Sequence, residues 1–297
     1  MTPPTPAPPA ALLFGCGYLG RRVAARWVGA GRRVAAVTRR NADELRALGL
    51  EPVVADVTNA ATLSALPRAA TVLYAVGMDR SAGHSMRDVY VGGLGNVLAA
   101  LPAGGRFVYV SSTSVYGQTD GNWVDETSPT EPTEEAGRVV IEAERLLRKR
   151  RPDAVVLRFA GLYGPDRLLR KSAILKGEPL VGDADKWLNL VHAEDGADAV
   201  LAAEERAAPG STYTIADDAP TPRRAFYTLL AELLNAPPAV FDERPEPGAA
   251  NRRVSNRRAK AELGWTPRFP SFRDGLTASV APRHLVPGKS GTPSEKH

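Results

Sequence analysis

The chain has 297 residues, of which 43% are hydrophobic and 24% charged, and its formal net charge is +5. These values are typical of one large globular domain, or of a domain with a smaller lobe. No apolar run approaches the roughly 20 residues of a membrane-spanning helix, so we expect no membrane partner. The single cysteine excludes an internal disulfide and fits the reducing cytoplasm, where we expect the protein. The basic residues are spread over several segments without interleaved aromatic residues, so we expect no nucleic-acid partner.

Both ends of the chain are rich in proline or polar residues. Residues 1–10 read MTPPTPAPPA and lack the charged start and apolar run of a secretory signal, so we expect a disordered leader. Residues 286–297 read VPGKSGTPSEKH, and we expect a disordered tail there.

The first half of the chain alternates apolar runs with amphipathic ones, which predicts strands followed by helices. Strands are predicted at 11–15, 32–40, 52–56, 71–77, 106–112 and 154–159, and helices at 18–31, 41–49, 85–101 and 135–150. Nearly continuous apolar strands are typical of a parallel sheet covered on both faces. The expected fold class is therefore α/β, a Rossmann-type doubly wound parallel sheet with a small C-terminal lobe.

The alternation breaks near residue 160, where prolines and scattered aromatic residues become frequent. We expect residues 11–160 to form the Rossmann domain, with 190–215 returning to it. Residues 161–189 and 216–285 should then form a substrate lobe at the carboxyl ends of the strands, where open α/β sheets bind ligands.

The stretch GCGYLG has glycines at three spaced positions, Gly15, Gly17 and Gly20, with Tyr18 and Leu19 between the last two. It follows a predicted strand and opens a helix, which is the context of a dinucleotide-binding loop. The glycines would allow the tight turn, the approach of a pyrophosphate and close helix packing. An ordinary glycine-rich turn is the alternative.

The second predicted strand ends in Thr38, Arg39 and Arg40, where an NAD site usually has an acid for the ribose 2′-hydroxyl. Arginine can bind a 2′-phosphate through its planar fork of donors. We therefore expect NADP(H) to be favoured over NAD(H). The alternative is two exposed arginines that precede a helix.

Two further strand ends are expected to contact the cofactor. Asp56, followed by Val57, could accept a hydrogen bond from the adenine amino group, or it could cap the next helix. The small residues Ala75, Val76 and Gly77 would let a cofactor pass close to the backbone, or they could form a simple turn.

With these pieces, the chain resembles the extended short-chain dehydrogenase/reductase family, and within it the NAD-dependent epimerase/dehydratase group that acts on nucleotide sugars. The resemblance covers about residues 10–280. It rests on the order and spacing of GCGYLG, ADVT, YVSSTSVYG, LRFAGLYGP, NLVHAEDGADAV and ELGWTP.

The resemblance implies a site of Ser or Thr, Tyr and Lys, often with an Asn, and this chain departs from it. Ser112 matches the serine, but the tyrosine and lysine positions fall on Ala136 and Val140, and the Asn position falls on Tyr90. Alanine and valine cannot move protons. The alternative reading of the two aliphatic residues is ordinary packing of a helix on the sheet.

An acid/base that has moved could be Tyr90, Tyr116 or His84, the nearest proton-carrying side chains that the pattern places on the ligand side. In the lobe, Trp187 could stack on a ring, Asn189 could hold a polar group, and Arg158 could reach a phosphate. Two of these residues also have a structural alternative: Trp187 could pack in the core of the lobe, and Arg158 could form an ion pair. The segment 252–265 is basic and could be a nucleotide contact or a solvated helix face.

The sequence therefore predicts an NADP(H)-dependent oxidoreductase or epimerase/dehydratase-like enzyme with an altered acid/base. Its partner would be a small-molecule substrate, sugar-like and with or without a nucleotide attached. The alternative is a non-catalytic NADP(H)-binding or sensor protein on the same fold. No metal site is expected, since one cysteine and four scattered histidines show no ligand spacing. A homodimer is one oligomeric state that remains open.

Overall fold

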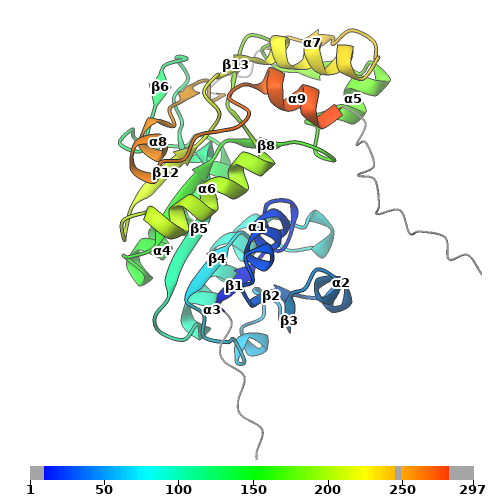
Figure 1. Ribbon diagram of the computed structural model, residues 1–297. Helices are drawn as coiled ribbons and strands as arrows, with labels where there is room; N and C mark the ends of the chain where they lie inside the picture. The colour runs from blue at the N-terminus through cyan, green and yellow to red at the C-terminus, as the bar shows by residue number, and fades with distance from the viewer. Residues whose placement is uncertain (1–9, 245–248, 281–297) are drawn as a thin grey trace, which may run out of the picture.

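The computed structural model describes residues 10–244 and 249–280 (Figure 1). The predicted leader, apart from Ala10, and the predicted tail lie outside the described residues. Among the residues described, no helix is both long and apolar enough to cross a membrane.

The centre of the fold is a parallel sheet of seven strands in the order β12-β7-β5-β4-β1-β2-β3. The strands are β1 (Ala11–Phe14), β2 (Val34–Thr38), β3 (Glu51–Val54), β4 (Thr71–Tyr74), β5 (Arg106–Ser112), β7 (Val155–Phe159) and β12 (Thr212–Ile215). The order reverses between β1 and β4, as in a doubly wound sheet. All residues of β1, β4 and β7 are buried, whereas the edge strand β3 is partly exposed. The predicted Rossmann-type fold is confirmed.

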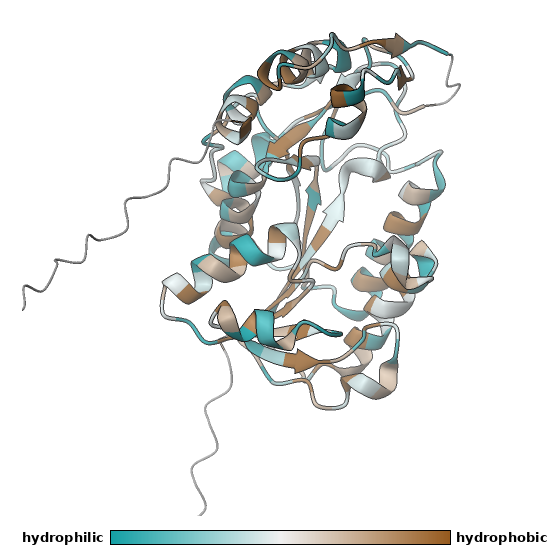
Figure 2. Ribbon diagram, turned by 90° about the vertical axis from the view of Figure 1, so that its right-hand side faces the viewer, coloured by the Kyte–Doolittle hydropathy of each residue, from teal (hydrophilic) through white to brown (hydrophobic). Residues whose placement is uncertain are grey.

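Helices cover both faces of the sheet, and the apolar strands run between them (Figure 2). On one face α1 (Tyr18–Gly29) packs against α6 (Ala193–Arg206); on the other, α3 (Gly93–Ala100) packs against α4 (Glu135–Arg150). The short helix α2 (Ala42–Ala47) lies beside β3. The predicted helix at 85–101 begins as a π-helical turn, Asp88–Gly92, before it continues as α3.

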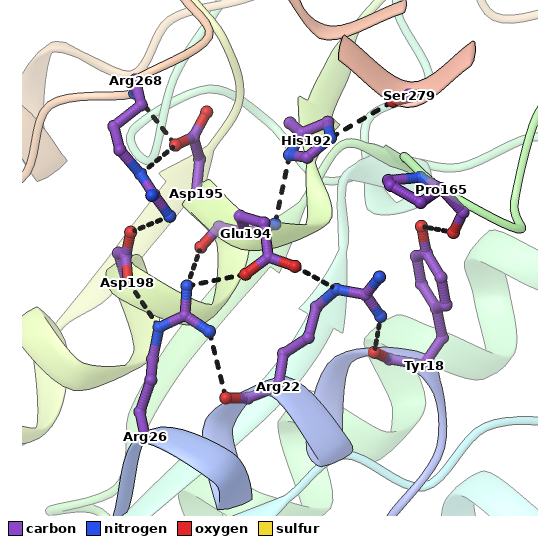
Figure 3. Close-up of polar contacts among 10 residues, drawn as sticks. All are labelled: Tyr18, Arg22, Arg26, Pro165, His192, Glu194, Asp195, Asp198, Arg268 and Ser279. Atoms are coloured by element: carbon purple, nitrogen blue, oxygen red, sulfur yellow. Dashed lines mark hydrogen bonds and ion pairs between the residues drawn. The ribbon is translucent and has the colours of Figure 1, made fainter. Parts of the chain in front are cut away.

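Ion pairs join α1 to α6 (Figure 3). Glu194 pairs with Arg22 at 2.8 Å and with Arg26 at 2.9 Å, and Arg26 also pairs with Asp198 at 2.6 Å. His192 caps α6 by accepting a hydrogen bond from the amide of Glu194. These contacts fix α6, the helix that follows the first part of the lobe, on the sheet.

The lobe lies at the carboxyl ends of the strands, at the top of Figure 1, and has a core of its own. Its helices are α5 (Lys171–Lys176), α7 (Arg223–Leu233) and α9 (Phe272–Val280). Its short strand pairs are β8 (Gly161–Tyr163) with β11 (Leu190–His192), β9 (Leu180–Val181) with β14 (Phe241–Asp242), and β10 (Trp187–Leu188) with β13 (Thr221–Pro222).

Part of the range predicted for the lobe returns to the main domain. Helix α8 (Arg257–Leu263) packs on α6 and β12, and its Ala259 and Leu263 join the main core together with Trp265. Strand β15 (Arg253–Val254) pairs with β6 (Trp123–Val124) of the main domain. The prediction of one continuous lobe segment from 216 to 285 missed this return, because buried apolar residues of both cores look alike in sequence.

A buried ion pair joins α4 to the sheet. The guanidinium of Arg158 on β7 donates to both carboxylate oxygens of Glu144, at 3.1 and 2.8 Å, and to the Tyr116 hydroxyl at 2.9 Å. Ser111 on β5 donates to the same carboxylate. Burial alone would lower the pKa of Arg158, but Glu144 raises it above its ordinary value, so the arginine stays charged. The structure thus gives Arg158 a pairing role and corrects the prediction that it reaches a substrate phosphate.

Replacing Glu144 by glutamine keeps the shape of the side chain and removes the charge that compensates Arg158. We expect the free energy of unfolding to fall by about 3–5 kcal/mol, because a buried arginine is left without its counter-charge. Chemical denaturation measures this loss. Glu142 lies on the same helix, in an exposed pair with Arg87, and supplies the matched control. Glu142→Gln should cost far less, and equal losses from the two variants would contradict the structural role of the pair.

Candidate functional site

A cavity of about 890 Å³ opens along the carboxyl ends of β1, β2, β4, β5 and β7. Its walls carry most of the residues that the sequence singled out for the cofactor, and also Ser112, Tyr90, Ala136 and Val140. Elements distant in sequence meet here because the strands of a parallel sheet all end at the same edge.

The glycine loop has the geometry of a phosphate cradle. Gly15 has φ +89°, and a Cβ there would lie 2.2 Å from the carbonyl oxygen of Ala75. A Cβ on Gly20 would lie 2.2 Å from the carbonyl oxygen of Gly15, so these two glycines hold the turn. Gly17 precedes the first turn of α1 and lines the cavity, and a Cβ there would meet nothing within 4 Å. Gly17 therefore borders open space at a helix N-terminus, where a pyrophosphate would fit. Tyr18 and Leu19 line the same end of the cavity.

The end of β3 forms a second group on the cavity wall. The Asp56 carboxylate accepts hydrogen bonds from the amide and the hydroxyl of Thr58, at 2.9 and 2.7 Å. Burial alone would raise the pKa of Asp56, but the hydrogen bonds from Thr58 lower it, so the carboxylate is ionised. The ring of His84 lies 3.4 Å from the Thr58 hydroxyl. His84 is thus beside Asp56 and the glycine-loop half of the cavity, which corrects its candidacy as a proton carrier beside Ser112.

Further contacts at this end come from β2 and β4. Val57, Ala75, Val76 and Gly77, which the sequence predicts to contact the cofactor, line the cavity. Arg39 also lines it, and its guanidinium pairs across the opening with Asp79 at 2.6 Å. Hydrogen bonds from Ser81 and Arg39 lower the pKa of Asp79 to about 2. Arg40 is exposed and does not contribute to the cavity wall, so the structure separates the two arginines that the sequence treated together.

Ser112, Ala136, Val140 and Tyr90 line the cavity where α4 packs against β5 and against the π-helical turn that holds Tyr90; we call this part the Ser112 end. The Ser112 oxygen accepts a hydrogen bond from the Ser114 amide at 3.1 Å, which leaves its O–H proton for another acceptor. Tyr90 is half-buried in the middle of the π-helical turn, and among the described residues its hydroxyl has no hydrogen-bond partner. π-Helical turns recur at functional sites because the extra residue reorients a side chain.

The structure places Tyr116 elsewhere. Its side chain is fully buried, and its hydroxyl accepts the hydrogen bond from Arg158. Burial raises the pKa of Tyr116 to about 12. It does not line the large cavity, although it borders a smaller one beside it, and its hydroxyl is held by Arg158. Its candidacy as the proton carrier is corrected to a part in this buried network.

A smaller cavity of about 210 Å³ adjoins the Ser112 end and is lined by Trp187 and Asn189. Both predicted substrate ligands are already engaged. The Asn189 amide group bonds to the carbonyl of Arg252 and the amide of Val254, and Arg253 lies over the ring of Trp187 at 5.2 Å from its centroid. Asn189 is therefore corrected to a residue that holds the chain, and one face of Trp187 is covered.

The sequence did not predict two positively charged residues that line this wall. Arg252 lines both cavities and Lys186 lines the smaller one. Residues 252–265 stood out only as a basic segment, and nothing local in it distinguishes Arg252 from Arg253. Among the described residues, no group of three or more His, Cys, Asp or Glu side chains is placed to hold a metal ion.

Comparison with known proteins places the chain in a family. The sequence profile of the NAD dependent epimerase/dehydratase family matches residues 11–216. The chain is 34% identical to Protein YeeZ of Escherichia coli K12 over 166 residues, which is 56% of this chain and 59% of that protein. The chain therefore matches less than two thirds of that curated relative.

Two further similarities agree with this. A 4-hydroxy-2-methyl-3-oxo-4-farnesyl-3,4-dihydroquinoline-1-oxide ketoreductase of Stigmatella aurantiaca is 28% identical over 240 residues, 73% of this chain and 71% of that protein. The structure of MoeE5 in complex with UDP-glucose and NAD superposes with a TM-score of 0.75 at 24% identity, covering 91% of this chain and 97% of that one. The protein belongs to the NAD-dependent epimerase/dehydratase family.

Gly17→Val tests whether the glycine loop is the cofactor cradle. The new side chain would project into space that only a ligand would fill, so NADP(H) binding should be abolished while the melting temperature changes little. Calorimetric titration and thermal unfolding measure the two effects. Gly20→Ala is the contrast, because its Cβ would collide with the Gly15 carbonyl, and it should lower stability as well. Normal cofactor binding by Gly17→Val would show that the cradle lies elsewhere.

Proposed function

We propose that this protein is an NADP(H)-dependent oxidoreductase or epimerase-like enzyme that acts on a sugar-like small molecule through an altered acid/base. One observation carries the proposal: a single cavity joins an open glycine loop to Ser112 and Tyr90. Family membership supports the use of a nicotinamide cofactor, which when bound supplies a hydride acceptor or donor. A nucleotide attached to the sugar is the narrower version, in keeping with the UDP-glucose held by MoeE5. The cytoplasmic location and a homodimer stay predictions.

Ser112 is the residue that would orient the substrate. Its oxygen already accepts the Ser114 amide, so its proton points to a different acceptor, and a substrate carbonyl or hydroxyl oxygen in the cavity would fit. A hydrogen bond that strengthens as negative charge develops on that oxygen favours reaction.

Tyr90 is the residue that would carry the proton. The positions where the family resemblance implies tyrosine and lysine are Ala136 and Val140, and both line the same cavity end as Tyr90. Neither can exchange a proton, and Val140 cannot supply the positive charge by which the family's lysine lowers the pKa of its tyrosine. The hydroxyls of Tyr90 and of Tyr109, which lines the same cavity, both lack a hydrogen-bond partner among the described residues. Tyr109 is buried on β5, so the half-buried Tyr90 is the phenol that we favour.

The same aliphatic pair favours a second candidate function. With Ala136 and Val140 in place of an acid/base pair, the chain could bind the cofactor without turning over a substrate. A non-catalytic NADP(H)-binding or sensor protein would keep the glycine loop and use the lobe for a partner or an effector.

The cofactor preference rests on Arg39. Its guanidinium lines the cavity and pairs with Asp79. A bound 2′-phosphate would replace Asp79 as the partner of Arg39. Arg39→Ala should weaken NADP(H) binding on the order of ten- to a hundredfold and leave NAD(H) binding nearly unchanged. Calorimetric titration with both cofactors measures this. Arg40→Ala is the matched control, since Arg40 is absent from the cavity wall. Loss of preference in both variants, or in neither, would contradict the assignment.

Turnover distinguishes the enzyme from the sensor. NADPH oxidation and NADP⁺ reduction are followed against sugar nucleotides, aldehydes and ketones. On a substrate that reacts, we expect Tyr90→Phe to lower kcat by about a hundredfold, as loss of a proton carrier does, and Ser112→Ala to lower kcat/KM. Ala136→Ser should change little.

Tyr213→Phe is the control, because the Tyr213 hydroxyl bonds to Glu262 away from the cavity. Turnover that survives both Ser112→Ala and Tyr90→Phe would overturn their assignment. Silence across the screen, with tight cofactor binding, would favour the sensor.

A further inference from the structure

The segment Asn251–Val254 crosses from the lobe to the sheet and is fastened at every residue. Its residues Arg253 and Val254 pair with β6 as strand β15. Asn251 bonds through its side chain to the Trp187 amide and through its own amide to the Gln118 carbonyl. Asn189 holds the backbone of residues 252 and 254. A side chain on this segment is therefore held in one place.

Side chains alternate along the segment, as they do along a strand. The guanidinium of Arg253 lies 5.2 Å from the ring centroids of both Trp123 and Trp187. Val254 lies on the opposite side and is buried in the main core. Arg252 shares the side of Val254 and lines the large and the small cavity where they adjoin.

The guanidinium of Arg252 is only partly satisfied. One terminal nitrogen donates to the Thr113 carbonyl at 2.7 Å, while the buried Nε has no hydrogen-bond partner. Among the described residues no carboxylate forms an ion pair with Arg252, whereas the more deeply buried Arg158 has Glu144. Burial lowers the pKa of Arg252. A half-buried cation without an ion-pair partner costs free energy, which a ligand of opposite charge would recover.

The adjoining wall adds a second positive charge. Lys186 is half-buried in the small cavity, and among the described residues its ammonium forms no ion pair. The acid on this wall, Glu134, is exposed and forms no ion pair with either cation, although its negative charge acts on Arg252 and opposes the effect of burial on the pKa of that arginine. Thr113, which holds Arg252, directly follows Ser112, so the cations lie beside the residue that would orient the substrate.

We propose that Arg252, supported by Lys186, binds an anionic group of the substrate, a carboxylate or a phosphate, next to Ser112. The planar fork of the arginine suits either group. The proposal rests on the proposed function in that the same cavity admits the substrate, and it narrows the substrate class to charged molecules.

The test is a binding measurement that needs no turnover. The full chain, with NADP⁺ bound, is titrated calorimetrically with glucose 6-phosphate, glucuronate and glucose. These probes share a sugar and differ in charge, and the first two separate phosphate from carboxylate. We expect at least one charged sugar to bind and glucose to bind far more weakly. Arg252→Gln should weaken the charged sugar on the order of ten- to a hundredfold and leave NADP⁺ affinity unchanged.

Arg257→Gln is the matched control, since it removes the same charge from an exposed position five residues away, outside both cavities. Arg252→Lys keeps the charge without the fork and should bind the charged sugar with intermediate affinity, which keeps the test open if Arg252→Gln does not fold. Equal affinities for the three sugars, no binding of any of them, or unchanged binding by Arg252→Gln with a lowered melting temperature would each overturn the proposal. Loss of NADP⁺ binding in the unmodified chain would instead overturn the proposed function.

Discussion

The buried pair of Glu144 and Arg158 is the constraint on which the site depends. It ties α4 to β7, and through Ser111 to β5, inside the core. Helix α4 carries Ala136 and Val140, and β5 ends at Ser112, so one ionic contact fixes the two walls of the Ser112 end against each other. Tyr116 completes the network rather than the site. The desolvation penalty of burying such a charge pair offsets much of the attraction between the two charges. Its main effect is therefore to fix the relative positions of the elements that it joins.

The two ends of the cavity rely on different parts of the chain. The glycine loop works through its backbone: Gly15 and Gly20 let elements approach closely, and Gly17 leaves open space. The shape of such a backbone site does not depend on which side chains line the Ser112 end. The Ser112 end is lined by side chains, among them the aliphatic Ala136 and Val140 together with Tyr90 and Arg252. Cofactor binding can thus persist while the chemistry changes, which is why the cofactor half alone does not distinguish an enzyme from a sensor.

Much of the fold followed from the sequence, and less of the site did. The strands that end at or shortly before Gly15, Asp56 and Ser112 are visible in the sequence as apolar runs followed by turn residues, so the sheet and the cavity edge could be predicted. Partners distant in sequence could not. The residues next to Arg158 in sequence do not show that it pairs with Glu144. Nor do the neighbours of Asn189 show that its side chain forms hydrogen bonds with residues 63 and 65 positions away. Arg252 and Arg253 are neighbours in sequence, yet only the fold turns one to the cavity and the other to two tryptophans.

The most direct measurement is a crystal structure of the protein with NADP⁺ bound. Our account predicts that the pyrophosphate lies against Gly17, that the 2′-phosphate takes Arg39 from Asp79, and that the nicotinamide lies among Ser112, Tyr90, Ala136 and Val140. A nicotinamide directed away from Ser112, or one that faces a proton-carrying side chain other than Tyr90, would contradict the central claim that this cavity end performs chemistry with a relocated acid/base.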